Sequence, residues 1–351
     1  MTPALSPEPA PDLGPEVTAA IQNLLALLDP PTARRQAQNL LTAAAELIAG
    51  RPANLDLKIA ASAVDEMGEA FRMFAPYRDR RKVSIFGSAR TKADDPLYLQ
   101  ARKVAEHLAM HDWMVITGAG PGIMQAAMEG AGREKSIGVS IRLPFEQGAN
   151  PIIAGDAKYV SMKYFFTRKL MLIKESAAFV CLPGGFGTLD ETFELITLTQ
   201  TGKGVPVPIV FLDTPGDPYW EEVASFVETQ LLARGLAAPS DAKLYFVTDS
   251  CEAAVHEINH FYANDDSMRF VGDLLVIRLR HELTDDQLAE VNATFGHLCA
   301  DGSIERSAPL PLEVKENDKV DLHRIAFSFV KHWFGDLRQL IDLLNGYVAD
   351  T

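Results

Sequence analysis

Cysteine is scarce in this chain: Cys181, Cys251 and Cys299 are odd in number and far apart. This spacing provides neither a disulfide framework nor a zinc site, so we expect a reduced, cytoplasmic setting. No apolar run reaches the ~18 residues of a membrane span. The Pro-rich, acidic start, residues 1–9, lacks the apolar region of a signal peptide. We therefore expect no membrane contact and a short disordered tail at the N-terminus.

Positive charge is also in deficit. The chain has 33 Lys and Arg against 47 Asp and Glu, a formal net charge of −14. This balance argues against a general nucleic-acid or anionic-membrane binder, although a few local cations can still hold a small anion. The patterns of a Gly-x-Ser-x-Gly elbow, a Gly-Lys-Ser/Thr P-loop and a His-Glu-x-x-His site are missing as well.

The 351 residues are long enough for two or more domains, and three parts can be predicted. Residues 1–76 combine the tail with helices, because apolar residues recur at helical spacing over 17–28, 40–47 and 60–74. Their polar residues form no catalytic-looking cluster. We therefore interpret this segment as a helical cap or dimerisation element rather than a catalytic domain.

Residues 77–265 alternate apolar strands with amphipathic helices. Strands are expected at 83–86, 113–117, 136–141, 177–182, 207–212 and 245–247, and helices at 98–111, 123–133 and 164–175. This alternation predicts an α/β fold, a Rossmann-like doubly wound parallel sheet covered on both faces. Ligands bind beyond the carboxyl ends of such strands, where the glycine-rich turns of this chain fall.

The regular alternation of strands and helices ends in residues 266–351. Strands are expected at 273–279 and 325–329, and helices at 285–298 and 334–344. Thr284 and Gln287 have the spacing of a capping box. The order predicts a small α+β C-terminal module, for which we infer an assembly or regulatory role because it has no catalytic-looking cluster.

The most informative segment is Leu182–Glu191, a glycine-rich turn between a predicted strand and a predicted helix. Such a turn directs free backbone N–H groups and the positive end of a helix dipole outward, which suits a phosphate. Glu191 then lies in the first helical turn. An acid at that position is often present only because it interacts favourably with the helix dipole. A carboxylate is repelled by a neighbouring phosphate, however, so Glu191 is better suited to a chemical role than to phosphate binding.

A second turn, Gly118-Ala119-Gly120-Pro121-Gly122, allows several interpretations. A dinucleotide site expects its third glycine one residue later and an acid about twenty residues on, where this chain has Arg142. Three interpretations of this turn therefore stay open. It could bind NADP, whose 2′-phosphate an Arg can accept, it could bind a mononucleotide or phosphosugar, or it could be a purely structural turn. The role of the pair Arg168-Lys169 is equally open, because cationic side chains on a helix often only face solvent.

Together these segments resemble the Lonely-Guy (LOG) family, many of whose members were once labelled lysine decarboxylases. Residues 183–191 match its P-G-G-x-G-T-x-x-E signature, Arg168-Lys169 its R-K pair, and 86–90 and 117–124 its first two turns. The similarity covers residues 80–250. The flanking segments and residues 138–144 differ from the short plant-type members, so cytokinin specificity is not expected to transfer.

The resemblance implies a role for each matching residue. Arg168 and Glu191 correspond to the catalytic pair. The phosphate-binding and substrate-binding positions are Gly87, Ser88, Gly118, Gly120, Gly122, Lys169, Gly184, Gly185, Gly187, Thr188 and Thr197. We expect the positive charge of Arg168 to keep Glu191 ionised. No metal and no cofactor is expected.

The implied activity is hydrolysis of nucleoside 5′-monophosphates to free base and ribose 5-phosphate by a nucleosidase, or phosphoribohydrolase. A carboxylate at Glu191 suits this reaction, because positive charge develops on the ribose as the glycosidic bond breaks. The alternative is a non-catalytic nucleotide- or cofactor-binding carrier or sensor on the same scaffold. Either protein is expected to form a homodimer or higher homo-oligomer.

Overall fold

The computed structural model describes residues 11–30, 33–143 and 148–348, so the predicted tail at 1–9 lies outside the described residues. The chain forms two compact units, one ending at Gly68 and the other beginning at Glu69. The first unit contains α1 (Gly14–Leu28), α2 (Arg34–Ala49) and the first part of α3 (Asn54–Phe74). These bounds confirm the three predicted helices. Within the described ranges, no helix is long and apolar enough to cross a membrane.

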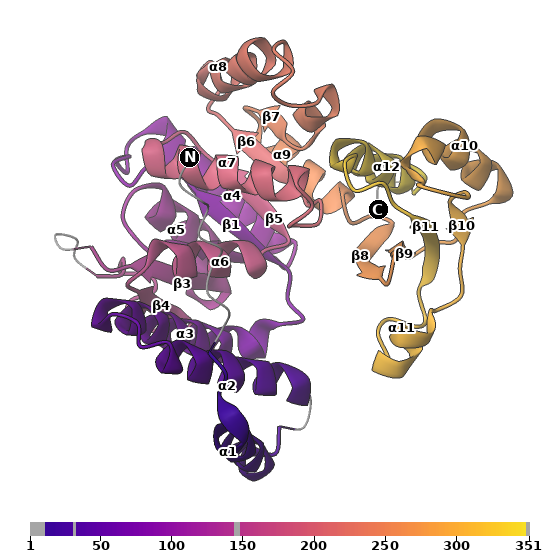
Figure 1. Ribbon diagram of the computed structural model, residues 1–351. Helices are drawn as coiled ribbons and strands as arrows, with labels where there is room; N and C mark the ends of the chain where they lie inside the picture. The colour runs from indigo at the N-terminus through magenta and orange to yellow at the C-terminus, as the bar shows by residue number, and fades with distance from the viewer. Residues whose placement is uncertain (1–10, 31–32, 144–147, 349–351) are drawn as a thin grey trace, which may run out of the picture. The chain divides into compact units, whose positions relative to one another are not determined.

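The second unit contains a seven-stranded sheet in which all neighbouring strands are parallel. Its order is β4-β3-β2-β1-β5-β6-β7 (Figure 1). The strands are β1 (Lys82–Phe86), β2 (Met114–Thr117), β3 (Ser136–Ile141), β4 (Tyr159–Met162), β5 (Ala178–Cys181), β6 (Ile209–Leu212) and β7 (Phe246–Thr248). The chain builds outward from β1 to β4 and then crosses to β5 on the other side of β1. The predicted doubly wound α/β fold is therefore confirmed.

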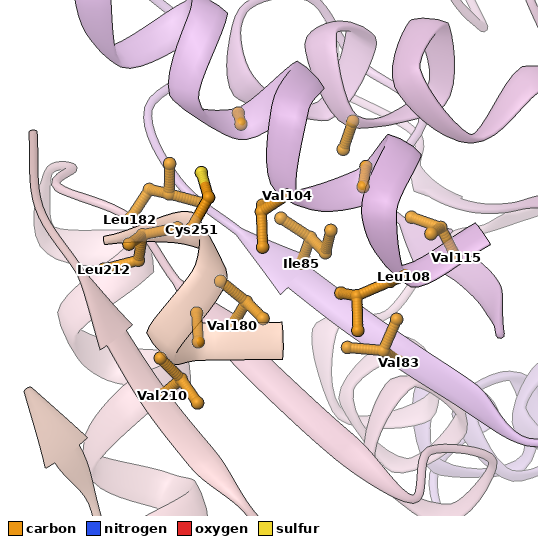
Figure 2. Packing of buried hydrophobic residues seen from close by; sticks show 14 of the residues in the cluster. Val83, Ile85, Val104, Leu108, Val115, Val180, Leu182, Val210, Leu212 and Cys251 are labelled. Atoms are coloured by element: carbon orange, nitrogen blue, oxygen red, sulfur yellow. The ribbon is translucent and has the colours of Figure 1, made fainter. Parts of the chain in front are cut away.

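Helices cover both faces of this sheet. They are α4 (Pro96–Met110), α5 (Ile123–Lys135), α6 (Phe165–Lys174), α7 (Phe186–Gln200), α8 (Tyr219–Phe226) and α9 (Cys251–His260). Figure 2 shows one face, where Val83 and Ile85 of β1 pack with Val104 and Leu108 of α4. Burying such a side chain contributes about 1.5–3 kcal/mol. On the opposite face, the hydroxyl of Ser84 donates to the carbonyl of Leu172 in α6.

A four-stranded antiparallel sheet follows, in the order β10-β11-β9-β8. Its elements are β8 (Asp265–Val271), β9 (Leu274–Leu279), α10 (Asp285–Phe295), β10 (Glu305–Arg306), α11 (Pro311–Glu316), β11 (His323–Ser328) and α12 (Phe334–Gly346). One face of the sheet packs its apolar residues against α10 and α12. The capping box of Thr284 and Gln287 is confirmed at the start of α10. The α+β module is thus present, while the three-domain boundaries stay a prediction.

Several elements have no counterpart in the sequence analysis. They are β4, α8, α9, β8, β10 and α11, together with the short helices η1 (Ala75–Tyr77), η2 (Val227–Leu232), η3 (Pro239–Lys243) and η4 (Gly296–Leu298). Among the missed strands, β4 and β10 are short and lie at the edges of their sheets. A short edge strand needs no long apolar run, so its sequence carries little periodic signal.

Helices α4 and α5 approach each other closely at Gly130. A Cβ atom on Gly130 would lie 2.0 Å from the carbonyl oxygen of Arg102. We predict that Gly130→Ala destabilises the protein by about 1–3 kcal/mol, because backbone must move to admit the methyl group. Gly346→Ala is the matched control: its Cβ would meet open space in α12, so the change should be neutral or stabilise by up to about 1 kcal/mol. Denaturant unfolding measures both, and equal effects would contradict the packing argument.

Candidate functional site

A cavity of about 1000 Å³ lies at the carboxyl ends of the central strands. Its walls come from the turns after β1, β2 and β5, from the end of β3, from β4, and from α5, α6, α7 and α8. The turns after β1 and β5 belong to adjacent strands at the point where the winding of the sheet reverses. Crevices at such points are the usual ligand sites of doubly wound sheets.

The turn after β1 is held between the other two glycine turns. The N–H of Ser88 donates to the carbonyl of Pro183 after β5, at 3.3 Å. The carbonyl of Ser88 accepts from the N–H of Ile123 after β2, at 3.0 Å. A Cβ on Gly122, whose φ is +66°, would lie 2.4 Å from the Ser88 oxygen. Gly122 therefore serves the close approach of the turns, and it does not line the cavity.

The turn after β5 leads directly into α7, whose first residue is Phe186. Gly185 caps this helix without any side-chain hydrogen bond. A Cβ on Gly184 would lie 2.2 Å from the Thr188 hydroxyl oxygen, so the turn closes tightly upon the helix. Gly185 and Gly187 have open space where their Cβ atoms would be. This open helix start, facing a cavity, can accept an anion through backbone N–H groups.

Arg168 and Glu191, the pair that the family resemblance implied, lie next to each other in this cavity. Arg168 Nη1 lies 3.5 Å from Glu191 Oε1, and the two side chains are only 11% and 14% exposed. Arg168 Nε donates to the carbonyl of Val139 in β3, at 3.1 Å. A Cβ on Gly118 would lie 2.5 Å from Arg168 Nη2, so the glycine makes room for the guanidinium.

The electrostatic environment of Glu191 differs from the expectation. Burial raises the pKa of Glu191 above its ordinary value, and this effect outweighs the charges of Arg168 and Lys169, which lower that pKa. The positive charge of Arg168 thus favours the carboxylate, as expected, but it does not decide the net shift. A carboxylate with a raised pKa is a stronger base than an exposed one.

Most of the predicted site residues come together. Those that line the cavity are Gly87, Ser88, Gly118, Gly120, Arg168, Gly184, Gly185, Gly187, Thr188 and Glu191. Lys169 is outside the lining and pairs with Asp190 and Glu194 of α7, at 2.7 Å each. Thr197 is also outside, and its hydroxyl donates to the carbonyl of Phe193. The predicted substrate contacts of Lys169 and Thr197 therefore stay predictions.

Two tyrosines in the cavity wall were missed from the sequence. The hydroxyl of Tyr219, in α8, donates to the carbonyl of Gly184 at 2.7 Å and braces the turn after β5. The hydroxyl of Tyr159, in β4, is 2.8 Å from that of Ser140 in β3. Neither tyrosine belongs to a local motif, so only the tertiary packing of α8 and β4 brings them to the site.

The lining is cationic although the chain is acidic. Among the residues that the structure describes, the charged ones in the lining are Arg90, Arg142 and Arg168 and one acid, Glu191. This excess of positive charge suits an anionic ligand. Within the described ranges, no group of three His, Cys, Asp or Glu side chains is placed to hold a metal ion.

A family model described as "Possible lysine decarboxylase" matches residues 122–258. A probable cytokinin riboside 5′-monophosphate phosphoribohydrolase of Arabidopsis thaliana, of the LOG group by its name, is 32% identical over 36% of this chain and 61% of that protein. A rice protein (Oryza sativa subsp. japonica) of the same description is 33% identical over 27% of this chain and 40% of that protein. The matches thus span about two fifths to three fifths of these relatives. They confirm the predicted resemblance to the LOG family.

Solved structures give weaker likenesses. The molybdenum cofactor carrier protein of Chlamydomonas reinhardtii is 20% identical, with a TM-score of 0.35 over 51% of this chain and 96% of that chain. The molybdenum cofactor binding protein of Rippkaea orientalis is 16% identical, with a TM-score of 0.37 over the same shares. Likenesses at this level carry no conclusion about function.

The burial of Glu191 gives a prediction for the free protein. Its carboxyl group should titrate above the ordinary pKa of Glu, about 4.3. Arg168→Met should raise that pKa further, because the variant lacks the positive charge that favours the ionised carboxylate. The measurement is an NMR titration of ¹³C-labelled Glu carboxyl groups, with the Glu191 signal assigned by its loss in Glu191→Gln. A Glu191 that titrates at or below 4.3 would contradict the dominance of burial.

Proposed function

We propose that this chain, whose core resembles the LOG family, hydrolyses nucleoside 5′-monophosphates to free base and ribose 5-phosphate. The observation that carries the proposal is the buried pair of Arg168 and Glu191, 3.5 Å apart, in a cavity that also contains the open turn before α7. A phosphate-binding turn alone would suit many ligands. A carboxylate held beside it is what hydrolysis of a glycosidic bond requires.

The 5′-phosphate is proposed to bind at Gly184–Thr188. Backbone N–H groups and the dipole of α7 favour negative charge there, and Tyr219 fixes the turn through the carbonyl of Gly184. The phosphate does not react. The free energy of binding it is therefore available to hold the reacting carbon of the ribose against Glu191.

Glu191 is proposed to act on the anomeric carbon. As the bond from C1′ to the base nitrogen breaks, its electron pair leaves with the base and C1′ becomes positively charged. The carboxylate stabilises this charge, and it accepts a proton from the water whose oxygen forms the new bond to C1′. The base nitrogen takes up one proton, so the products are free base and ribose 5-phosphate. Arg168 holds a ribose hydroxyl or the phosphate and keeps the Glu191 carboxylate in place.

A homo-oligomer, predicted from the resemblance, stays part of the proposal. Helix α6, which carries Arg168, exposes the apolar side chains of Phe165, Phe166 and Leu170 by 54%, 54% and 46%. Apolar side chains so exposed beside a catalytic residue are the kind that a second copy of the chain covers.

The activity can be tested with a panel of AMP, GMP, CMP, UMP and a cytokinin nucleotide. We expect free base from at least one of them, and a fall of about 10²- to 10⁴-fold in kcat for Glu191→Gln, because the variant lacks the base. Glu194→Gln, one turn along α7 and outside the cavity lining, is the matched control and should stay within a few-fold of the parent. Unfolding midpoints establish that both variants fold.

Two results would count against hydrolysis. One is the absence of free base with every nucleotide, and the other is full activity of Glu191→Gln. Tight nucleotide binding by calorimetry without turnover would favour the alternative, a carrier or sensor on the same scaffold.

The pH dependence follows from the direction of the Glu191 shift. The ionised carboxylate is the active form, so kcat/KM should fall as pH decreases through a pKa that lies above the ordinary value for Glu. Lys169→Met should move this acid limb to higher pH, because the charge of Lys169 lowers the pKa of Glu191. A pH–rate profile of both proteins checks this. An acid limb that stays in place in the variant would show that another group controls it.

A further inference from the structure

The cavity has a second polar end, which the proposed reaction does not use. Ser140 and Arg142 at the end of β3 and Tyr159 and Ser161 of β4 form this end of the wall. Strand β3 is three positions from β5 in the sheet, which corresponds to about 14 Å at the usual strand spacing. Arg168, bonded to Val139 of β3 and paired with Glu191 of α7, lies between the two ends.

Arg142 is fixed at this end by its backbone partner. Its Nε and Nη2 both donate to the carbonyl of Ser161, at 3.3 and 2.8 Å. A guanidinium has five N–H donors and no acceptor. This geometry leaves the two Nη1 hydrogens and one Nη2 hydrogen for other acceptors. A ligand that reaches Arg142 therefore meets donors only.

The hydroxyls of Ser140 and Tyr159 complete the set. They are 2.8 Å apart, and the Ser140 side chain is largely buried in the wall. One hydroxyl donates to the other, so the pair keeps one hydrogen to donate and lone pairs to accept. This end of the cavity thus combines the fixed donors of Arg142 with one adaptable pair, an arrangement suited to the polar edge of a planar heterocycle.

We infer that this end binds the base, and that Arg142 selects 6-oxopurine nucleoside monophosphates over AMP. The inference rests on the proposed function, because it assumes that the phosphate occupies the turn before α7. An Arg donates to the carbonyl oxygen and ring nitrogen on the outer edge of guanine or hypoxanthine, and this is the commonest specific contact to guanine. Adenine presents an amino donor at the same place, which leaves Arg142 without an acceptor for one of its N–H groups.

IMP and AMP provide the test, because on the edge of the base formed by position 6 and N7 they differ only at position 6, an oxygen in IMP and an amino group in AMP. We expect kcat/KM for IMP to exceed that for AMP by about 5- to 150-fold, the range that one bidentate pair contributes. Arg142→Met removes the donors and keeps an unbranched side chain, and it should bring the ratio to within about threefold of unity by lowering the value for IMP. The side chain is exposed and bonds to a single carbonyl, so the variant should fold.

Arg133→Met is the matched control. Arg133 also donates to backbone carbonyls, those of Ile152 and Ala154, but it is outside the cavity lining. Its substitution should leave the ratio of IMP to AMP unchanged. Inhibition by ribose 5-phosphate, which has no base, should be equal in the parent and in Arg142→Met.

The outcomes separate the two proposals. Turnover with no preference for IMP, or an equal loss for IMP and AMP in Arg142→Met, overturns the selectivity and leaves the hydrolysis in place. Weaker inhibition by ribose 5-phosphate in that variant would assign Arg142 to the phosphate instead. If no nucleotide is hydrolysed, the proposed reaction fails. Calorimetric binding of IMP and AMP to the parent and to Arg142→Met then still decides whether Arg142 discriminates between the bases.

Discussion

The buried guanidinium of Arg168 is the feature on which the arrangement of the cavity depends. It bonds to the backbone of β3, fills the space that Gly118 leaves after β2, and faces Glu191 on α7. A buried ion pair adds little net stability, because its attraction is largely offset by the loss of hydration. Its contribution is positional, since a charge that is already in place does not have to be reorganised when charge develops on a substrate.

The glycine turns could be predicted from the sequence because each signal is local, whereas the pairing of Arg168 with Glu191 was implied only by the resemblance to the LOG family. A strand, a glycine-rich turn and a helix start occupy a few consecutive residues, and the carboxyl ends of parallel strands lie on one edge. The order of the strands in the sheet, in contrast, has no local signal. It places β1 between β2 and β5, so that the backbone of Ser88 bonds to the turns on either side. No local pattern contains that order, and the mutual bracing of the turns could not be predicted.

The same distinction explains where single side chains lie. Lys169 follows Arg168 in the sequence, but consecutive helical residues point about 100° apart, so its ammonium group reaches the acids of α7 instead of the cavity lining. Tyr219 and Tyr159 are the opposite case. They lie far from every motif in the sequence and enter the cavity wall through the packing of α8 and β4.

Charge links the acidic composition of the chain to the chemistry of its cavity. The chain carries a net charge of −14, yet the cavity lining contains three Arg and one Glu in the part of the chain that the structure describes, so positive charge is in excess there, where an anion would bind. Glu191 is the exception, and the burial that raises its pKa has two effects. Burial makes the carboxylate more basic, and it would reduce the ionised fraction if no cation were near. Arg168 and Lys169 oppose that loss because their charges lower the pKa of Glu191, although burial stays the larger effect.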